Sequence, residues 1–231
     1  MIEVAVAGAA GRMGETVCAA VEAAPDMNLV GRADPRLDVT LAEVLAGAQP
    51  PEVVVDFTQP DTALENALAC VQAGVHVAIG TTGFDIAPLL AARTPKDLPP
   101  ANVLIAPNFA IGAVLMMRFA AEAARHMARA EIIELHHDGK LDAPSGTAKH
   151  TAQLMAAASG DAAGPGGIPI HSVRLPGLVA SQEVLLGDVA QTLSIRHDTT
   201  GRESFMPGVL LAIRRVGALT ESPVVGLEHL L

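Results

Sequence analysis

Short apolar runs alternate with amphipathic segments over the first hundred residues of the chain. The apolar runs predict strands at Ile2–Ala7, Leu29–Arg32, Val53–Val55, Val75–Ile79 and Asn102–Ala106. The segments between them have helical periodicity, at Glu15–Ala24, Leu41–Ala46 and Pro60–Ala73. Strands that alternate with helices are typical of a parallel sheet with helices on both faces, and entirely apolar strands fit a sheet that is buried on both sides. This region therefore predicts an α/β fold with a doubly wound (Rossmann) parallel sheet.

The pattern changes near Pro107, after which an Ala- and Met-rich helical segment covers Gly112–Met127. A second helix is predicted near Thr147–Ala158, and further strands at Glu131–His137, Ile170–Arg174, Gln182–Leu186 and Thr192–His197. A last helix and strand are predicted at Pro207–Val216 and Val224–Val225. We therefore expect a dinucleotide-binding domain over residues 1–107, to which residues 208–231 return. Residues 108–207 are expected to form a second, α+β domain with a mixed or antiparallel sheet.

The composition narrows the classes of function. Half of the 231 residues are hydrophobic. The formal net charge is −10, which argues against a nucleic-acid-binding protein, because such a protein needs a basic surface. No apolar run reaches the roughly 20 residues of a membrane span, and no leader pattern precedes the first predicted strand. We therefore expect a cytoplasmic protein that binds neither nucleic acid nor membrane. Cys18 and Cys70 lack metal-binding spacing and are expected to be buried thiols.

Three glycines, Gly8, Gly11 and Gly14, follow the first predicted strand and open the first predicted helix. A dinucleotide-binding loop needs glycine for its tight turn, for close approach to the pyrophosphate, and for packing of helix against strand. The G-x-x-G-x-x-G spacing is a variant of the commoner G-x-G-x-x-G. Asp34 follows the second strand about 20 residues after Gly14, where a carboxylate can bind ribose hydroxyls. A plain glycine-rich turn, and a capping or surface role for Asp34, are the alternatives.

Two other segments stand at the ends of predicted parallel strands. They are Gly80-Thr81-Thr82-Gly83 and Ala106-Pro107-Asn108-Phe109. Ligands of doubly wound sheets bind outside the carboxyl ends of the strands. The joint placement of the two segments therefore makes them candidates for one ligand site, although either alone would pass for an ordinary turn.

A dense polar cluster occupies residues 131–149, with the sequence E-I-I-E-L-H-H-D-G-K-L-D-A-P-S-G-T-A-K. Histidine is the side chain best suited to move a proton at neutral pH, and Lys140 adds a positive charge beside His136 and His137. The predicted helix start at Gly146-Thr147 offers N–H groups to a carboxylate. No metal is expected, because adjacent histidines on a strand point to opposite faces and no further ligand stands at the right spacing.

The segment E-L-H-H-x-x-K-x-D-A-P-S-G-T-A resembles the signature of the dihydrodipicolinate (4-hydroxy-tetrahydrodipicolinate) reductases. G-x-x-G-R-M-G, D-F-T-x-P, G-T-T-G, A-P-N-F and R-x-S-F-x-P-G resemble other segments of that family, in the same order along the chain. The resemblance implies an NADPH- or NADH-dependent oxidoreductase of lysine and diaminopimelate biosynthesis. Its substrate would be a cyclic imine dicarboxylate, reduced to tetrahydrodipicolinate. It also implies a homotetramer that assembles through the second domain.

The same resemblance assigns roles to individual residues. His136 would donate the proton, Lys140 would be a second catalytic cation, and His137, Gly146 and Thr147 would bind the substrate. The cofactor site would comprise Gly8, Ala9, Ala10, Gly11, Arg12, Met13, Asp34, Gly80, Thr81, Thr82, Ala106, Pro107, Asn108 and Phe109.

The sequence departs from the family pattern in three places. The chain is short, with the shortening expected around Gly160–Pro169, and Ala110 stands where a serine is common. Pro35 follows Asp34 where some relatives carry an arginine, which leaves recognition of a 2′-phosphate open. Two alternatives are a nicotinamide-dependent dehydrogenase of an amino-acid semialdehyde and a non-catalytic NAD(P)H-sensing protein. Neither would need the His136–Lys140 cluster.

Overall fold

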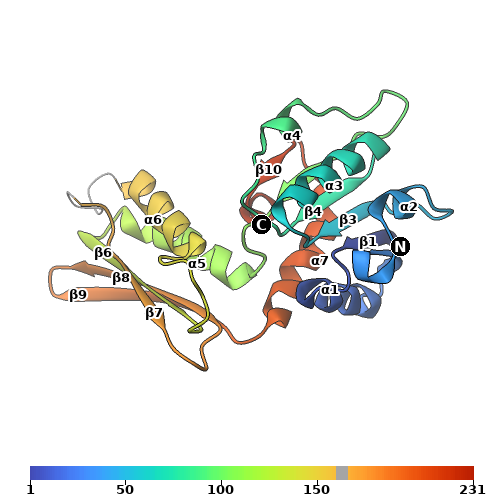
Figure 1. Cartoon of the computed structure of the whole chain (residues 1–231). Coiled ribbons are helices and arrows are strands. Elements are labelled where there is room, and N and C mark those ends of the chain that lie inside the picture. Colours follow the sequence, from blue (N-terminus) through green and yellow to red (C-terminus); the bar gives the residue numbers. More distant parts are fainter. Residues whose placement is uncertain (160–165) are drawn as a thin grey trace. The chain divides into compact units, whose positions relative to one another are not determined.

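A parallel sheet of six strands, in the order β10-β5-β4-β3-β1-β2, forms the centre of the first unit of the chain (Figure 1). The computed structural model describes residues 1–159 and 166–231. These divide into a first unit, Met1–Phe109 with Phe205–Leu231, and a second unit, Ala110–Ser204. The segment Gly160–Pro169, where the sequence analysis placed the shortening, lies largely outside the described residues.

The central strands of the first sheet are largely apolar and buried, as the sequence predicts, whereas β2 and β10 at its edges are more exposed. The strands are β1 (Ile2–Ala7), β2 (Met27–Ala33), β3 (Val53–Asp56), β4 (His76–Ile79), β5 (Val103–Ile105) and β10 (Val224–Val225). β1 and β3 lie side by side in parallel register. Successive strands are added in one direction from β1 to β2 and in the opposite direction from β3 to β5, so the strand order reverses between β1 and β3. The sheet is therefore doubly wound, and a ligand is expected outside the carboxyl ends of these two strands.

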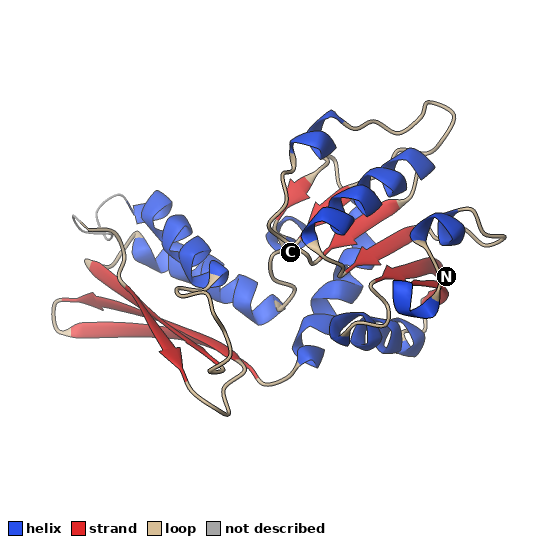
Figure 2. Ribbon diagram, in the orientation of Figure 1, coloured by secondary structure: helices blue, strands red, loops and turns tan. Residues whose placement is uncertain are grey.

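Helices cover both faces of this sheet (Figure 2). One group consists of α2 (Leu41–Leu45), α3 (Pro60–Ala73) and α4 (Ala87–Ala91), and the other of α1 (Arg12–Ala23) and α7 (Met206–Arg215). Three short 3-10 helices, Pro35–Leu37, Val216–Ala218 and Leu227–Leu230, also belong to this unit. The five-residue helix α4 has no counterpart in the sequence analysis.

The second unit packs two helices against one face of a mixed sheet. The strands, in the order β7-β6-β8-β9, are β6 (Arg129–His136), β7 (Ile170–Arg174), β8 (Ala180–Asp188) and β9 (Gln191–Thr199). β6 pairs with β7 in parallel and with β8 antiparallel. Helices α5 (Ile111–Ala124) and α6 (Gly146–Ser159) bury residues such as Ala120, Ala148 and Met155 against Ile132 and Val184. A 3-10 helix, Arg202–Phe205, follows β9. The predicted mixed α+β architecture is confirmed.

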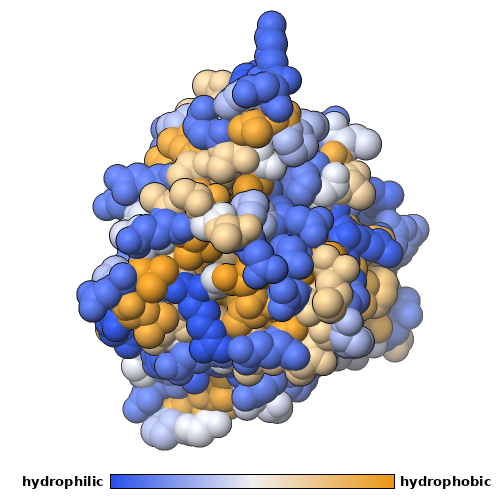
Figure 3. Space-filling view, turned by 90° about the vertical axis from the view of Figure 1, so that its right-hand side faces the viewer, coloured by the Kyte–Doolittle hydropathy of each residue, from blue (hydrophilic) through white to orange (hydrophobic). Residues whose placement is uncertain are grey.

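The surface is varied in polarity. Hydrophilic and hydrophobic residues are intermingled on the face shown in Figure 3. Among residues 1–159 and 166–231, no helix has the length and apolar character that crossing a membrane requires.

The glycine loop between β1 and α1 is a tight backbone packing site. Gly8 adopts a positive φ of 77°, a conformation that favours glycine. A Cβ on Gly14, in the first turn of α1, would lie 2.0 Å from the carbonyl oxygen of Gly8 and 2.8 Å from the Cα of Ala9. The obstacle is main chain, which cannot move aside as a side-chain tip could. Gly14 therefore sets how closely α1 approaches the turn.

Replacing Gly14 by Ala should destabilise the first unit, although Ala favours a helix by up to about 1 kcal/mol over Gly. Overpacking against fixed backbone typically costs about 1–3 kcal/mol, so we expect a net fall in the free energy of unfolding. Urea denaturation followed by circular dichroism measures the change. Gly187→Ala in β8, where a Cβ meets no atom within 4 Å, is the control. Equal stability of the two variants would contradict this packing argument.

Candidate active site and cofactor site

Asp34 lies directly after β2 and is 7% exposed. Its Oδ2 accepts a hydrogen bond from the backbone N–H of Ala10 at 3.1 Å, and its Oδ1 accepts one from the N–H of Arg36 at 2.8 Å. Burial alone would raise the pKa of this carboxyl group, but the two N–H donors and the Arg36 charge lower it overall. Asp34 therefore caps the 3-10 helix Pro35–Leu37 and at the same time fixes the glycine loop. The capping role that the sequence left open is observed.

Arg36 folds back over the glycine loop. Its guanidinium donates a hydrogen bond to the carbonyl oxygen of Ala10, and its Nε lies 3.5 Å from Oδ1 of Asp34. The side chain is 68% exposed, so it can still reach a ligand. A carboxylate and a guanidinium therefore stand together beside the glycine turn.

A cavity of about 530 Å³ adjoins these residues within the first unit. Its lining includes Gly8 and Asp34 together with Thr40, Thr58 and Asn66. Gly8 follows β1, Asp34 follows β2 and Thr58 follows β3. The cavity therefore lies at the carboxyl ends of these strands, at the point where the strand order reverses. A doubly wound sheet binds a nucleotide at this position.

The ends of β3, β4 and β5 converge on the ring of Phe57. A Cβ on Gly80 would lie 2.1 Å from that ring, and the ring of Phe109 packs against it at a centroid distance of 5.7 Å, tilted by 50°. The hydroxyl of Thr81 donates to the carbonyl oxygen of Thr58 at 2.7 Å. The structure thus brings together the G-T-T and A-P-N-F segments that the sequence analysis proposed for one site. Ala106 and Phe109 are buried, so their side chains contribute packing.

Asp56, at the end of β3, is a buried carboxyl group that the sequence analysis did not select. It accepts hydrogen bonds from the N–H and the hydroxyl of Thr58, at 2.8 and 2.6 Å, and from the side-chain amide of Asn66 at 2.7 Å. Burial raises its pKa in spite of these donors. Its contacts fix the loop that carries Phe57 and Thr58, which places both beside the cavity and the G-T-T segment.

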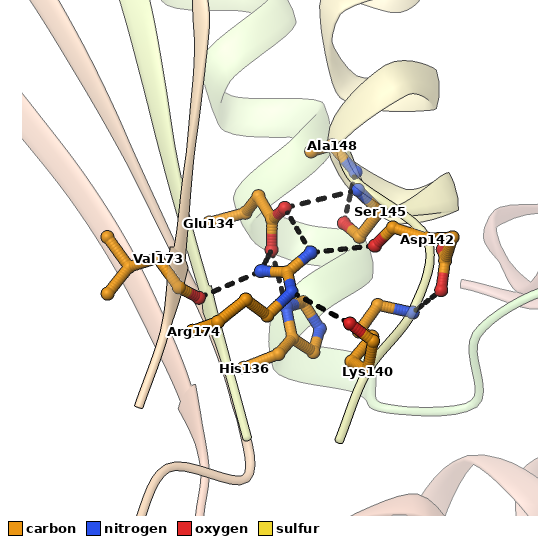
Figure 4. Close-up of polar contacts among 8 residues, drawn as sticks. All are labelled: Glu134, His136, Lys140, Asp142, Ser145, Ala148, Val173 and Arg174. Carbon is orange, nitrogen blue, oxygen red and sulfur yellow. Dashed lines mark hydrogen bonds and ion pairs between the residues drawn. The ribbon is translucent and has the colours of Figure 1, made fainter. Parts of the chain in front are cut away.

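In the second unit, His136 at the end of β6 is held by a buried carboxylate. Nδ1 of His136 lies 2.5 Å from Oε2 of Glu134, whose side chain is completely buried (Figure 4). A carboxylate can only accept a hydrogen bond, so Nδ1 carries a proton, and Nε2 is the ring nitrogen that does not contact Glu134. Burial lowers the pKa of His136, Glu134 opposes that shift, and Lys140 and Arg174 reinforce it.

Arg174, at the end of β7, completes this arrangement. It donates to both oxygens of Glu134, at 2.9 and 2.8 Å, and to the carbonyl oxygens of Lys140 and Asp142, at 3.3 and 2.7 Å. Figure 4 shows the guanidinium between the carboxylate and the loop that leads to α6. Burial would raise the pKa of Glu134, but the hydrogen bonds from Arg174, Ser172 and His136 lower it to about 2. Glu134 is therefore ionised at neutral pH.

Lys140 and the start of α6 lie beside this pair. The ammonium group of Lys140 forms a 2.6 Å ion pair with Asp142. The hydroxyl of Ser145 accepts a hydrogen bond from the N–H of Ala148 at 3.2 Å, the pattern of a helix N-cap, and the N–H of Ser145 donates to Glu134 at 3.3 Å. The first N–H groups of an α-helix have no partner within the helix. Gly146 and Thr147 stand at this end of α6.

Four of the proposed substrate-site residues lie along one short stretch of chain. His136 ends β6, Lys140 lies in the loop that follows, and Gly146 and Thr147 begin α6. His137 follows the last residue of β6 and is exposed. Among residues 1–159 and 166–231, no group of three His, Cys, Asp or Glu side chains could hold a metal ion.

The doubly wound sheet, its glycine turn and the acidic residue after β2 define the class of Rossmann-type dinucleotide-binding proteins. Two family models then divide the chain between them. Residues 2–109 match the N-terminus of dihydrodipicolinate reductase and residues 112–231 match its C-terminus. The chain belongs to the dihydrodipicolinate reductase family.

Relatives support this assignment over the whole chain. The 4-hydroxy-tetrahydrodipicolinate reductase of Thermobifida fusca is 50% identical over 250 residues, which cover 100% of this chain and 99% of the relative. That of Mycolicibacterium smegmatis is 47% identical, with the same coverage. The solved structure of dipicolinate-bound dihydrodipicolinate reductase from Paenisporosarcina sp. TG-14 is similar with a TM-score of 0.80 and 36% identity, and all of both chains is covered. Aspartate semialdehyde dehydrogenase II of Vibrio cholerae, at 11% identity and a TM-score of 0.56, shares the fold alone.

Proposed function

We propose that this protein catalyses the NAD(P)H-dependent reduction of 4-hydroxy-tetrahydrodipicolinate to tetrahydrodipicolinate in lysine and diaminopimelate biosynthesis. The observation that carries the proposal is the arrangement at the start of α6. There an oriented histidine, a lysine and a helix N-terminus lie together in a chain whose two halves both match this reductase family. A semialdehyde dehydrogenase or a nucleotide sensor would leave that arrangement without a role.

The first unit holds the nucleotide in this proposal. The turn Gly8–Met13 places main-chain N–H groups at the start of α1, where a pyrophosphate is stabilised by the helix dipole. Asp34 lines the cavity and accepts hydrogen bonds from ribose hydroxyls in addition to those it already receives. Gly80–Thr82 and Ala106–Phe109 complete the site at the neighbouring strand ends. The bound NADPH or NADH supplies the hydride.

The second unit holds the substrate and the proton. The N–H groups at Gly146 and Thr147, with His137, bind a carboxylate of the cyclic imine, and Lys140 offsets its negative charge. This local positive field is needed because the chain as a whole carries a net charge of −10. Loss of the 4-hydroxyl group as water gives a conjugated cyclic imine, one carbon of which accepts the hydride, and His136 delivers a proton from Nε2 to the neighbouring ring carbon. A dicarboxylate bound close by favours the protonated imidazole, which offsets the lowering of its pKa by burial.

Loss of the proton donor or of the cation should reduce turnover much more than cofactor affinity. We expect His136→Gln and Lys140→Ala each to lower kcat about 10²–10⁴-fold, the usual range for general-acid help, with NADPH binding close to that of the wild type. Oxidation of NADPH in the presence of enzymatically generated imine is the assay. His126→Gln, an exposed histidine on the neighbouring stretch after α5, is the control. Near-normal turnover of both site variants would remove these two residues from the mechanism.

Cofactor choice should be balanced. The Asp34 carboxylate repels a 2′-phosphate, whereas the exposed Arg36 guanidinium beside it attracts one. We expect the catalytic efficiencies with NADH and NADPH to differ by less than about a hundredfold. Arg36→Ala should impair NADPH use and spare NADH. Asp34→Asn, which keeps an oxygen for the 3-10 cap, should do the reverse. Absolute selectivity of the wild type for one cofactor would contradict this balance.

We also propose a cytoplasmic homotetramer that assembles through the second unit. Helices α5 and α6 cover one face of its sheet, while on the other face the apolar residues Ile133 and Leu135 are only partly buried and Leu185 is exposed. A family in which the second domain forms the assembly core would use this face. Light scattering at micromolar concentration should give a mass of about four chains, and Leu185→Glu should reduce it. A monomeric wild type would refute the assembly.

A further inference from the structure

Glu134 is the one completely buried carboxylate in the described part of the second unit, and it contacts four groups. They are the His136 imidazole, the Arg174 guanidinium, the Ser145 N–H and the Ser172 side chain. We propose that Glu134 and Arg174 are positioning residues for the reaction. In this role Glu134 sets the orientation and tautomer of His136, and Arg174 sets where Lys140 stands relative to it. The inference rests on the proposed function, because it concerns how the proposed proton donor is held.

The orientation of the histidine follows from what Glu134 can do. Residues 134 and 136 of β6 lie on the same face of the strand, so the carboxylate reaches back to the ring of its second neighbour. The contact is to Nδ1, at 2.5 Å. With Nδ1–H committed to the carboxylate, Nε2 is the only ring nitrogen left for the substrate. Rotation of the ring by half a turn would break a charge-assisted hydrogen bond in a buried site.

Arg174 links this pair to the lysine. In the parallel register of β6 and β7, Arg174 pairs with His136. Its guanidinium forms two parallel hydrogen bonds with Glu134 and two more with main-chain oxygens of Lys140 and Asp142. One planar group therefore touches both the carboxylate that holds the histidine and the backbone that carries the lysine. Lys could not make these four contacts, because its ammonium has three donors and no planar fork.

A purely stabilising ion pair is the competing explanation, and it makes a different prediction. Replacing both partners of a buried ion pair by well-packed apolar residues of similar volume is often neutral for stability, whereas removing one partner leaves an unpaired buried charge. If the pair serves stability alone, an apolar double variant should recover activity together with stability. If it positions His136 and Lys140, stability should recover and activity should not.

The variants are Glu134→Gln, Arg174→Lys and the apolar double variant Glu134→Leu with Arg174→Met. The control is Glu122→Gln, because Glu122 on α5 is also paired with a histidine and an arginine, His126 and Arg125, but is exposed. For Glu134→Gln we expect kcat to fall at least tenfold, with the KM for NADPH unchanged within twofold. The melting temperature of the double variant should return towards that of the wild type, while its kcat stays low.

Titration of His136 gives a readout that a structural role would not produce. The charged groups around its ring are Glu134 on β6, Arg174 on β7 and Lys140 in the following loop. Nitrogen-15 NMR of histidine-labelled protein without ligands should show Nδ1 protonated in the neutral ring of the wild type. Glu134→Gln removes the one negative charge among the three, so the pKa of His136 should fall further. Arg174→Lys should largely preserve this titration, lower kcat and raise the KM for the imine.

The outcomes separate this inference from the proposed function. A folded Glu134→Gln enzyme with the kcat and His136 titration of the Glu122→Gln control would overturn the positioning role. Full activity of the double variant would overturn it as well, and if Glu134→Gln alone does not fold, the double variant and Arg174→Lys decide. A wild type that fails to oxidise NADPH with the imine refutes the proposed function. The NMR measurements would still test whether Glu134 sets the tautomer.

Discussion

The bidentate contact between Glu134 and Arg174 determines the local structure of the second unit. A charged carboxylate with no exposed surface is costly unless every oxygen is satisfied, and here both oxygens receive guanidinium N–H groups. The pair joins two parallel strands, fixes the ring of His136 and holds the backbone of the loop before α6. The loop would otherwise have few reasons to adopt one conformation, since it contains Gly139 and several exposed residues.

The first unit relies on a different constraint, the close approach of main chain to main chain. Gly8 and Gly14 lie so close together that a Cβ on Gly14 would collide with the carbonyl oxygen of Gly8. A larger residue at position 14 would force the turn and helix α1 apart. Asp34 then reaches from the end of β2 to the N–H of Ala10, so the loop is held from both sides. The result is a rigid turn at a position where charge and hydrogen-bond donors must be placed accurately. Because the loop is already fixed, it loses little further conformational entropy when a ligand binds.

Periodicity and glycine spacing were sufficient to predict the doubly wound sheet, the second mixed sheet and the glycine turn. Local signals decide these features, because a short run of β-branched residues such as Val53–Val55 favours a buried strand. The polar cluster around His136 was also visible, since its members are close in sequence. Glu134 and Arg174 were missed for a physical reason. Alternation puts Glu134 on the face of His136, but only the pairing of β6 with β7 brings Arg174 beside it from 40 positions away. Likewise, nothing local reveals that Asp34 is already occupied by two main-chain donors.

The discontinuity of the first unit has a consequence for synthesis of the protein. Helix α7 packs against α1 and against β1, β3 and β4, and β10 adds the edge strand beside β5. These segments are synthesised after Ala110–Ser204, whereas the rest of their unit is synthesised before it. During translation one face of the nascent first sheet, lined by residues such as Val4, Val6 and Val55, is therefore covered by α1 alone until α7 has been made. The intervening residues, Ala110–Ser204, carry their own hydrophobic core and can fold in that interval. The order of synthesis thus favours completion of the inserted unit before the unit that surrounds it in sequence, and it leaves apolar surface of the incomplete sheet exposed until Phe205–Leu231 has been made.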